Sequence, residues 1–342
     1  MRLEPEPEVS VLQDSPTRLC ERFDLALVDL DGVVYLGNEA VPGAREHLAA
    51  ASEAGMRMTY VTNNAARPPR EVAQHLRALG IPADPDDVVT SAQAAAHLLA
   101  GRLPPGAAVF VIGGTGLCEA LVARGLQPVQ DMADEPSAVV SGYHPDLTWR
   151  TVAIGALLVK RGLPWIACNT DPTLPLAEGL APGNGALVDV VARFASRSPE
   201  VAGKPRPPLF TESVHRAGGR RPLVIGDRLD TDIEGAANAG LPSLLVLTGV
   251  SGLADLVAAP PAQRPSYLGT TLAALGEPHP APTVEGDYAV ASGWSARVVD
   301  ARLEVTGHGS IDNWCRAAVT AAWRHLDDDG QPVASIPDPP SR

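Results

Sequence analysis

Three short apolar runs, each followed by polar residues, alternate with helical patterns along this chain. Each run has the length of a strand and is almost continuously apolar, as expected for a parallel strand that is buried on both faces. The runs are residues 23–30, 56–62 and 222–226. Residues 43–55 and 68–80 favour helices that stop at a glycine. The order strand, helix, strand predicts βαβ units of an α/β fold with a doubly wound parallel sheet.

A second α/β series separates the second run from the third. Its expected strands and helices are residues 107–112, 117–124, 137–141, 149–161 and 165–169. A further helix over 186–196 leads back to the third run. We therefore expect one α/β domain to be inserted into another. The expected domains are a core at residues 23–82 and 184–275 and an inserted domain at 83–183. Pro82 and Gly183 flank the insertion and are candidate hinge positions.

The two ends of the chain differ from this pattern. Residues 1–22 begin with an acidic, proline-rich segment, and we expect a flexible tail. From residue 276 we expect a small α+β extension, with a proline-rich linker, two short strands and a helix. These elements are predicted at residues 277–287, 295–299, 302–305 and 311–326. The final residues, 327–342, are rich in Asp and Pro and are expected to be disordered.

Composition and charge exclude several classes of protein. The chain has 342 residues, 45% of them hydrophobic, which is enough for two or three domains of about 150 residues each. Its 27 Lys and Arg against 40 Asp and Glu give a net charge of −13. Such a chain repels nucleic acid and anionic membranes, so neither is an expected partner. The uncharged stretch at 235–254 contains glycines and a proline, and we interpret it as a helix end, a turn and a buried strand.

The cysteines and the N-terminal residues indicate a compartment. Cys20, Cys118, Cys168 and Cys315 lie far apart in sequence and form neither a CxxC metal motif nor a dense disulfide framework. The first residues lack the basic start and the apolar core of a signal peptide. Both observations favour free thiols in a reducing, cytoplasmic environment.

Polar side chains follow each of the three core runs. They are Asp29 and Asp31, then Thr62, Asn63 and Asn64, then Asp227, Asp230 and Asp232. The carboxyl ends of parallel strands meet at one edge of a sheet, so these side chains are expected to lie together. Carboxylates this dense repel one another unless a cation lies among them, and oxygen ligands favour Mg²⁺. Lys204, on a loop before the third run, is a further candidate positive charge.

This set of side chains suits phosphoryl transfer. Asp29 is expected to attack phosphorus and to form an aspartyl-phosphate. Asp31 is expected to protonate the leaving alkoxide and then to activate water. Mg²⁺ and Lys204 would neutralise the phosphoryl oxygens, and Thr62 and Asn63 would donate hydrogen bonds to them.

Four motifs, in order, resemble those of the haloacid dehalogenase superfamily of phosphatases. They are DLDGV, VTNN, AGKP and GDRLDTDI, which begin at residues 29, 61, 202 and 226. The resemblance covers about residues 23–275. The large insertion resembles the C2 cap of the type IIA (NagD-like) branch, which implies a hydrolase core that is covered by a cap.

The resemblance also implies a role for each motif residue. Asp29 would be the nucleophile and Asp31 the general acid and base. Mg²⁺ would be held by the side chains of Asp29 and Asp227 and by the backbone carbonyl of Asp31, with Asp232 supporting the metal shell. The phosphoryl group would be held by Thr62, Asn63, Asn64 and Lys204.

The inserted domain carries a narrower resemblance. Residues 168–175, CNTDPTLP, resemble the loop that decides substrate specificity in this family, and Leu174 is either a substrate contact or a packing residue of that loop. This loop and GYHPDLTW at 142–149 are most similar to mycobacterial glycerol-3-phosphate phosphatases, as are segments 89–101, 183–185 and 246–250. We therefore expect glycerol 3-phosphate as the substrate. Phosphoglycolate, pyridoxal phosphate and nucleotide monophosphates are the alternatives.

Other interpretations stay open. The chain is a catalyst or a non-catalytic module that binds a phosphorylated metabolite, and the intact set of motif residues favours the catalyst. The extension is a candidate for dimerisation or effector binding, which leaves a homodimer open. GGTG at 113–116 is too short for a dinucleotide-binding GxGxxG motif and predicts a tight turn between a strand and a helix.

Overall fold

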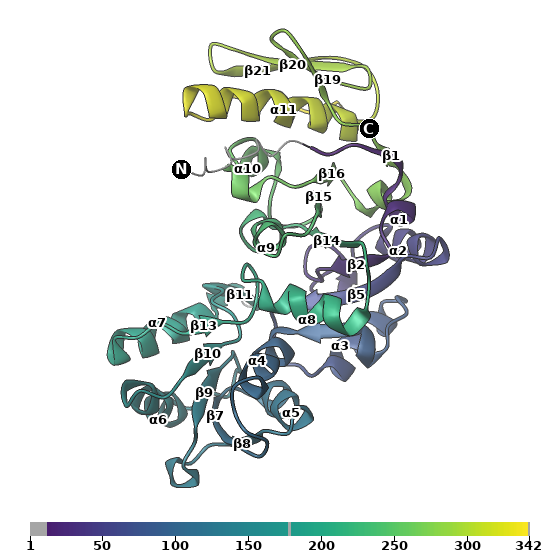
Figure 1. Ribbon diagram of the computed structural model, residues 1–342. Helices are drawn as coiled ribbons and strands as arrows, with labels where there is room; N and C mark the ends of the chain where they lie inside the picture. The colour runs from purple at the N-terminus through teal and green to yellow at the C-terminus, as the bar shows by residue number, and fades with distance from the viewer. Residues whose placement is uncertain (1–11, 177–178, 341–342) are drawn as a thin grey trace, which may run out of the picture. The chain divides into compact units, whose positions relative to one another are not determined.

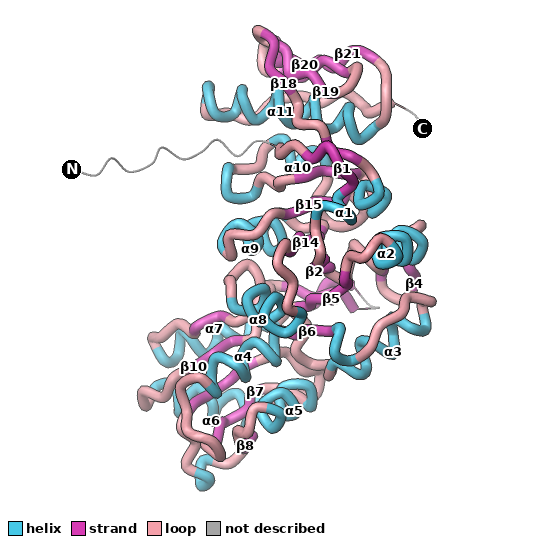
Figure 2. The backbone as a smooth tube through the Cα atoms, turned by 45° about the vertical axis from the view of Figure 1, so that its right-hand side comes forward, coloured by secondary structure: helices cyan, strands magenta, loops and turns pink. Residues whose placement is uncertain are grey.

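The computed structural model describes residues 12–176 and 179–340, and the chain divides into two compact units (Figure 1, Figure 2). One unit comprises Met1–Met58 with Gly219–Arg342, and the other comprises Thr59–Gly218. In the described part of the chain, no helix combines the length and the apolar character that a membrane crossing requires.

Four parallel strands form the centre of the first unit. Their spatial order is β16–β15–β14–β2, and each neighbouring pair is parallel. Their bounds are Leu25–Val28 (β2), Pro222–Gly226 (β14), Ser243–Val246 (β15) and Tyr267–Gly269 (β16). Every side chain of β2 is buried, as the continuous apolar run predicted. The predicted α/β fold with a parallel sheet is confirmed.

Helices and turns connect these strands. The longest of them, α2 (Ala44–Glu53), stops as predicted because Gly55 adopts a positive φ of 99°. Between the strands also lie a π-helical turn (Leu229–Ile233), α9 (Glu234–Asn238), α10 (Leu253–Val257) and a 3₁₀ turn at Pro261–Gln263. Helix α1 (Leu19–Arg22) precedes β2, and a 3₁₀ turn at Leu272–Gly276 follows β16. A two-stranded ribbon, β3 (Tyr35–Leu36) with β4 (Glu39–Ala40), precedes α2.

The extension is an antiparallel four-stranded sheet with one long helix on a face (Figure 1). Its elements are β18 (Thr283–Glu285), β19 (Tyr288–Ala291), β20 (Trp294–Val299), β21 (Arg302–Gly307) and α11 (Ile311–Asp329). Trp294, Trp314 and Trp323 are buried in one apolar cluster with residues of β15, β16 and α10. The indole of Trp323 donates a hydrogen bond of 2.7 Å to the carbonyl of Leu256. The extension therefore shares a core with the parallel sheet.

Described residues near both ends of the chain pair with distant segments, contrary to the sequence prediction. The expected tail lies outside the described residues up to residue 11, but β1 (Ser15–Arg18) pairs with β17 (Pro278–His279) inside the expected linker. The expected disorder after residue 327 is also wrong for Ser335, whose carbonyl accepts a hydrogen bond from Leu303 in β21. The prediction used composition alone, whereas these segments are ordered by hydrogen bonds to backbone groups that are far away in the sequence.

The second unit contains a five-stranded parallel sheet, in the spatial order β13–β10–β9–β7–β8. Its strands are β7 (Ala108–Ile112), β8 (Gln127–Val129), β9 (Ala138–Ser141), β10 (Trp165–Ala167) and β13 (Glu200–Val201). Helix α4 (Ser91–Ala100) packs with α5 (Thr115–Ala123), and α6 (Trp149–Lys160) packs with α7 (Asn184–Ala195). The connections through α5 and α6 run in opposite directions, so right-handed crossovers place the two pairs on opposite faces (Figure 1).

The remaining elements of this unit are not strands of that sheet. Strand β5 (Arg57–Thr62) begins in the first unit and ends in the second, where it pairs in parallel with β6 (Val88–Thr90). The others are α3 (Pro69–Ala78), α8 (Pro208–Ala217), a hairpin of β11 (Thr173–Leu176) with β12 (Gly179–Pro182), and 3₁₀ turns at Pro85–Asp87 and Met132–Asp134. The predicted inserted domain ended at residue 183, yet α7 buries Val188 and Val191 in the core of the five-stranded sheet. The domain boundaries stay a prediction.

Candidate active site

Three carboxylates meet in the first unit, at the carboxyl ends of β2 and β14. Asp29 follows β2, Asp227 follows β14, and Asp232 belongs to the π-helical turn after Asp227. One oxygen from each carboxylate lies within 4.8 Å of the other two. Asp227 and Asp232 are 0% and 1% exposed, whereas Asp29 is half-buried. Three buried or half-buried carboxylates at this spacing repel one another, so the cluster fits a hard divalent cation with oxygen ligands, such as Mg²⁺.

Backbone groups hold Asp227 in place. The amide of Val250 donates to Asp227 Oδ2 at 2.7 Å, and the backbone carbonyl of Asp227 accepts from Ser251 at 3.1 Å. Two glycines make room for its side chain. A Cβ atom on Gly249 would lie 2.0 Å from Asp227 Oδ2, and a Cβ atom on Gly32 would lie 2.4 Å from the same oxygen. The loop after β15 therefore decides where this carboxylate points.

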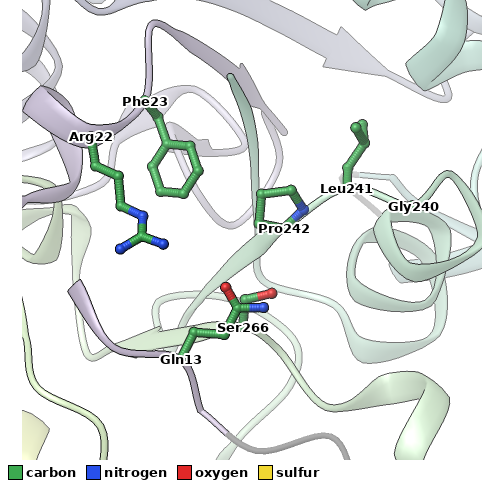
Figure 3. A pocket seen from close by; sticks show the side chains of 7 residues that line it. All are labelled: Gln13, Arg22, Phe23, Gly240, Leu241, Pro242 and Ser266. Atoms are coloured by element: carbon green, nitrogen blue, oxygen red, sulfur yellow. The ribbon is translucent and has the colours of Figure 1, made fainter. Parts of the chain in front are cut away.

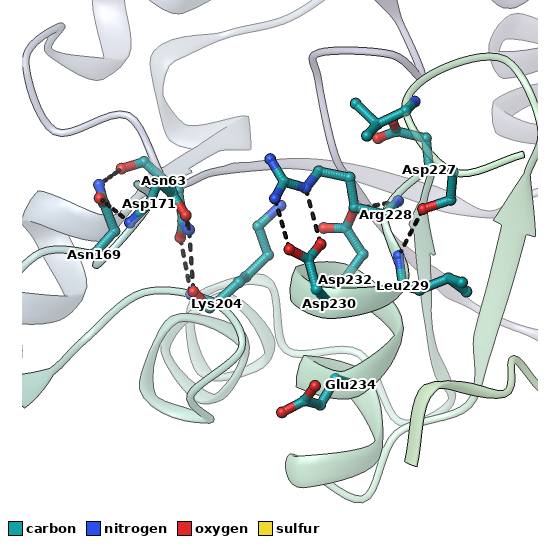
Figure 4. Close-up of polar contacts among 12 residues, drawn as sticks. Asn63, Asn169, Asp171, Lys204, Asp227, Arg228, Leu229, Asp230, Asp232 and Glu234 are labelled. Atoms are coloured by element: carbon teal, nitrogen blue, oxygen red, sulfur yellow. Dashed lines mark hydrogen bonds and ion pairs between the residues drawn. The ribbon is translucent and has the colours of Figure 1, made fainter. Parts of the chain in front are cut away.

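Asp232 is fixed by the turn that carries it (Figure 4). Its Oδ2 accepts a hydrogen bond of 3.1 Å from the amide of Arg228, and its side chain packs where Gly226 has no Cβ atom. The guanidinium of Arg228 makes two hydrogen bonds to Asp230, at 3.0 and 2.8 Å. Of the three aspartates in this motif, Asp230 pairs with Arg228, whereas Asp227 and Asp232 belong to the carboxylate cluster.

Asp29 and Asp31, the two aspartates of the first motif, differ in exposure. The amide of Asp29 donates to the carbonyl of Ile225 in β14 at 2.8 Å, which anchors the end of β2 beside the Asp227 motif. Asp31 is exposed, and the next residue, Gly32, has a positive φ of 87°. Thr248 Oγ1 donates to the carbonyl of Gly32 at 2.6 Å. The side chain of Asp31 is thus exposed beside a turn that Thr248 holds in place.

A second group of predicted residues meets in the second unit, around the side chain of Asn63 (Figure 4). Asn63 Oδ1 accepts from the amide of Lys204 at 2.8 Å, and Asn63 Nδ2 donates to the carbonyl of Lys204 at 3.1 Å. The same Nδ2 lies 3.2 Å from both carboxylate oxygens of Asp171. The end of β5, the Lys204 loop and the loop after β10 are therefore tied together by one amide group.

Further hydrogen bonds hold the backbone of Asn63. Its carbonyl accepts from Ser91 Oγ at 2.6 Å and from Asn169 Nδ2 at 2.7 Å. Asn169 in turn accepts at its own carbonyl from Asn184 Nδ2, at 2.6 Å. Lys204 is 4% exposed, and its ammonium group is the positive charge that the motif contributes. A buried network of this kind fixes the position of each member.

The other predicted residues of this unit have more local roles. Thr62 is 5% exposed, and its Oγ1 accepts a hydrogen bond of 3.1 Å from the amide of Asn64. Asn64 is exposed, and its Oδ1 accepts from the amide of Ala66 at 2.9 Å, so Nδ2 is the group that is left to face a ligand. Leu174 lies in β11, opposite Ala181, and is half-buried. Burial raises the pKa of the Cys168 thiol, which excludes it as a nucleophile at neutral pH.

The structure thus gathers the predicted residues in two groups. Asp29, Asp227 and Asp232 form the cluster of the first unit, and Asn63 and Lys204 are directly bonded in the second. Asp171 and Asn169 were missed as individual site residues, although their loop was predicted to contact the substrate. The sequence feature that could have identified them is the segment CNTDPT, in which two polar residues, Asn169 and Asp171, lie at and just after the end of a predicted strand. The joining of both groups around one substrate stays a prediction.

A separate hollow lies on the opposite edge of the parallel sheet of the first unit (Figure 3). It has a volume of about 400 Å³ and is lined by Arg22, Phe23, Pro242 and Ser266, among others. These residues precede β2, β15 and β16, whereas the carboxylate cluster follows the strands. Ligands of open α/β sheets bind at the carboxyl ends of the strands, which favours the carboxylate cluster as the reaction centre.

Family comparisons match the segments that carry both groups. Residues 26–127 match the family described as haloacid dehalogenase-like hydrolase, and residues 201–275 match a second, HAD-hydrolase-like family. The first segment contains Asp29 and Asn63, and the second contains Lys204, Asp227 and Asp232.

Individual relatives cover most of the chain. It is 44% identical over 314 residues to D-glycerol 3-phosphate phosphatase of Mycobacterium tuberculosis, covering 89% of this chain and 87% of that protein. It is 37% identical over 238 residues to an acid sugar phosphatase of Staphylococcus aureus, covering 69% of this chain and 91% of that protein.

Solved structures agree with the sequence comparisons. A crystal structure of glycerol phosphate phosphatase from M. tuberculosis, in complex with magnesium, superposes with a TM-score of 0.85 at 42% identity, covering 93% of this chain and 94% of that one. A 4-nitrophenylphosphatase of Thermotoga maritima gives a TM-score of 0.69 at 30% identity, covering 75% and 98%. The motifs, the carboxylate cluster and these matches lead to one conclusion: the chain belongs to the haloacid dehalogenase-like hydrolases.

Proposed function

We propose that this protein is a Mg²⁺-dependent phosphatase that hydrolyses glycerol 3-phosphate to glycerol and phosphate. The observation that carries the proposal is the cluster of Asp29, Asp227 and Asp232 in a chain that is 44% identical to a D-glycerol 3-phosphate phosphatase. Phosphoglycolate, pyridoxal phosphate and nucleotide monophosphates are the alternative substrates. The homodimer and the cytoplasmic location stay predictions.

The reaction proceeds in two displacements at phosphorus. In the first, a carboxylate oxygen of Asp29 attacks phosphorus, the bond to the ester oxygen breaks, and an aspartyl-phosphate forms. Asp31 donates its proton to the departing alkoxide, so that glycerol leaves as a neutral alcohol. In the second, Asp31 takes a proton from water, which attacks phosphorus and releases Asp29 and inorganic phosphate.

Other groups hold the phosphoryl group. Thr62, Asn63, Asn64 and Lys204 are proposed to bind its oxygens, with Lys204 supplying positive charge where negative charge accumulates. The side-chain amide of Asn63 is engaged with Lys204 and Asp171, so Asn63 would contribute through its main chain. Mg²⁺ would be held by the side chains of Asp29 and Asp227 and by the carbonyl of Asp31, with Asp232 supporting them. Mg²⁺, when bound, supplies further positive charge at the phosphoryl oxygens. Leu174 is proposed to contact the leaving group.

The test is phosphate release from a panel of esters, with and without Mg²⁺. The panel contains glycerol 3-phosphate, phosphoglycolate, pyridoxal phosphate, a nucleotide monophosphate and an aryl phosphate. We expect Mg²⁺-dependent release with the highest kcat/KM for glycerol 3-phosphate, and no measurable release by Asp29→Asn. Glu304→Gln removes an exposed carboxylate of the extension and serves as the control.

Two results would count against the proposal. Full activity of a folded Asp29→Asn variant would exclude the nucleophile. No release from any ester by the folded wild-type protein would favour a binding module instead. A higher kcat/KM for another ester would keep the reaction and replace the substrate.

A further inference from the structure

Glu212 is a buried carboxylate at the meeting point of three helices in the second unit. It lies on α8, and its side chain is 1% exposed. Its Oε1 pairs with the guanidinium of Arg124, at the end of α5, and lies 3.2 Å from Nε of Arg216. Its Oε2 lies 3.1 Å from Nδ1 of His97 on α4. Glu212 therefore joins α8 to the end of α5 through Arg124 and contacts α4 through His97, a pair that is ionic only when His97 is protonated.

The two oxygens of Glu212 are not equally satisfied. Two guanidinium groups share Oε1, whereas Oε2 is buried and has no hydrogen bond of good geometry to any described residue. Withdrawing a carboxylate from water is unfavourable, and ion pairs in the interior often recover that cost incompletely. An apolar side chain would fill the same place more cheaply. A buried ion pair of this kind is therefore weak evidence for stability, and a role in geometry is the alternative.

Two of these helices, α4 and α8, begin close to the proposed phosphate-binding residues Asn63 and Lys204. Helix α4 begins at Ser91, whose Oγ donates to the carbonyl of Asn63 at 2.6 Å. Helix α8 begins at Pro208, four residues after Lys204 in the chain. Asn63 and Lys204 are bonded to each other at these ends, and Glu212 and His97 meet farther along. The packing of α4 against α8 is thus fixed at two points.

We propose that Glu212 is a positioning residue for phosphate binding. It holds α8 against α4 and α5, and so keeps Lys204 and Asn63 in the geometry that receives the phosphoryl group. Without its charge, Arg124 and Arg216 would face each other unneutralised and push α5 away from α8. The inference rests on the proposed function, because it assigns the binding of phosphate to Lys204 and Asn63.

The test compares Glu212→Gln, which keeps the shape and removes the charge, with wild type. Small displacements of binding groups reduce reactivity strongly. We expect KM for glycerol 3-phosphate and the inhibition constant of inorganic phosphate to rise together, by about tenfold. The Mg²⁺ concentration for half-maximal activity should not change, because the carboxylate cluster lies in the other unit. Calorimetry with inorganic phosphate and Mg²⁺ measures the same binding without turnover.

Two further variants separate positioning from stability. Glu119→Gln breaks the exposed pair between Arg70 and Glu119 in the same unit and should change neither constant. Arg124→Gln together with Glu212→Gln removes one of the two facing guanidinium groups and should recover part of the lost affinity. If Glu212→Gln alone does not fold, this double variant is compared with wild type instead.

Failure of the positioning role and failure of the proposed reaction give different results. Lower thermal stability of Glu212→Gln with unchanged KM and unchanged phosphate affinity would overturn the proposal, since the role would then be structural only. Wild-type protein that binds inorganic phosphate but hydrolyses no ester would refute the proposed reaction, and the positioning role would still be decided by calorimetry on the variants.

Discussion

Asn63 holds the backbone of Lys204 with two hydrogen bonds. Its Oδ1 accepts from the amide of Lys204 at 2.8 Å, and its Nδ2 donates to the carbonyl of Lys204 at 3.1 Å. A Cβ atom on the preceding residue, Gly203, would lie 2.4 Å from that Oδ1. The two residues are 141 positions apart in the sequence, so this contact fixes a loop that local structure alone does not.

Asn63→Asp should therefore impair catalysis strongly. The new carboxylate has no donor for the carbonyl of Lys204 and repels the carboxylate of Asp171, 3.2 Å away. We expect kcat/KM to fall by roughly 100-fold, with the Mg²⁺ requirement unchanged. Steady-state kinetics over a range of Mg²⁺ concentrations measures both. An unchanged kcat/KM in a folded variant would show that this contact is dispensable.

Gly249→Ala should weaken metal binding. Its new methyl group would lie 2.0 Å from Asp227 Oδ2, so the carboxylate must move away from the cluster. We expect the Mg²⁺ concentration for half-maximal activity to rise by about 10- to 100-fold, the range seen when groups that orient ligands are changed. Gly252→Ala is a matched control on the same loop, because its methyl group would meet nothing closer than 3.8 Å. Equal Mg²⁺ requirements in the two variants would contradict this account.

His279 should make the fold less stable in mild acid. Its Nε2 donates to the carbonyl of Ala274 at 2.8 Å, and its Nδ1 accepts from the guanidinium of Arg316 at 2.8 Å. Burial and the charge of Arg316 lower the pKa of His279 from 6.5 to about 4, although nearby Asp312 opposes the shift. The unfolded chain therefore takes up a proton between about pH 6.5 and pH 4, while the folded chain does not.

Because the unfolded chain binds more protons in acid than the folded chain, acid favours unfolding. The free energy of unfolding should fall as the pH decreases from 6.5 to 4, and His279 should account for about 3 kcal/mol of that fall. Urea unfolding of wild type and of His279→Gln across pH 4–8 isolates the contribution, because other acidic groups titrate in both. Parallel curves for the two proteins would assign the pH dependence to other groups.

Asp327→Asn should loosen the extension. Arg264 has a fully buried side chain, and its two terminal nitrogens contact the carboxylate of Asp327 at 2.7 and 2.6 Å. Its guanidinium also stacks 5.2 Å from the ring of Trp323. Removing one charge of such a pair leaves the other buried and uncompensated, so we expect a loss of about 2–4 kcal/mol in unfolding free energy. Denaturant unfolding with the exposed neighbour variant Asp328→Asn as control measures the difference. Equal stability of the two variants would contradict it.

The sequence by itself determined the α/β fold and the chemistry of the carboxylate cluster. Strands buried on both faces must be continuously apolar, so β2, β14 and the strands of the inserted sheet are visible in the pattern. Parallel strands bring their carboxyl ends together, so Asp29, Asp227 and Asp232 were expected to meet. Apolar runs and the residues that follow them are local features of the sequence, and the geometry of a parallel sheet is general.

The tertiary structure decided the partners of polar groups and of short strands. Pairing of β1 with β17 and of Leu303 with Ser335 orders segments that composition predicted to be flexible. Glu212 looks like one more surface charge in the sequence, and only packing reveals it as a buried link among three helices. The physical reason is that hydrophobic burial follows a local period along the chain. A hydrogen bond or ion pair depends on which distant segment supplies the second group.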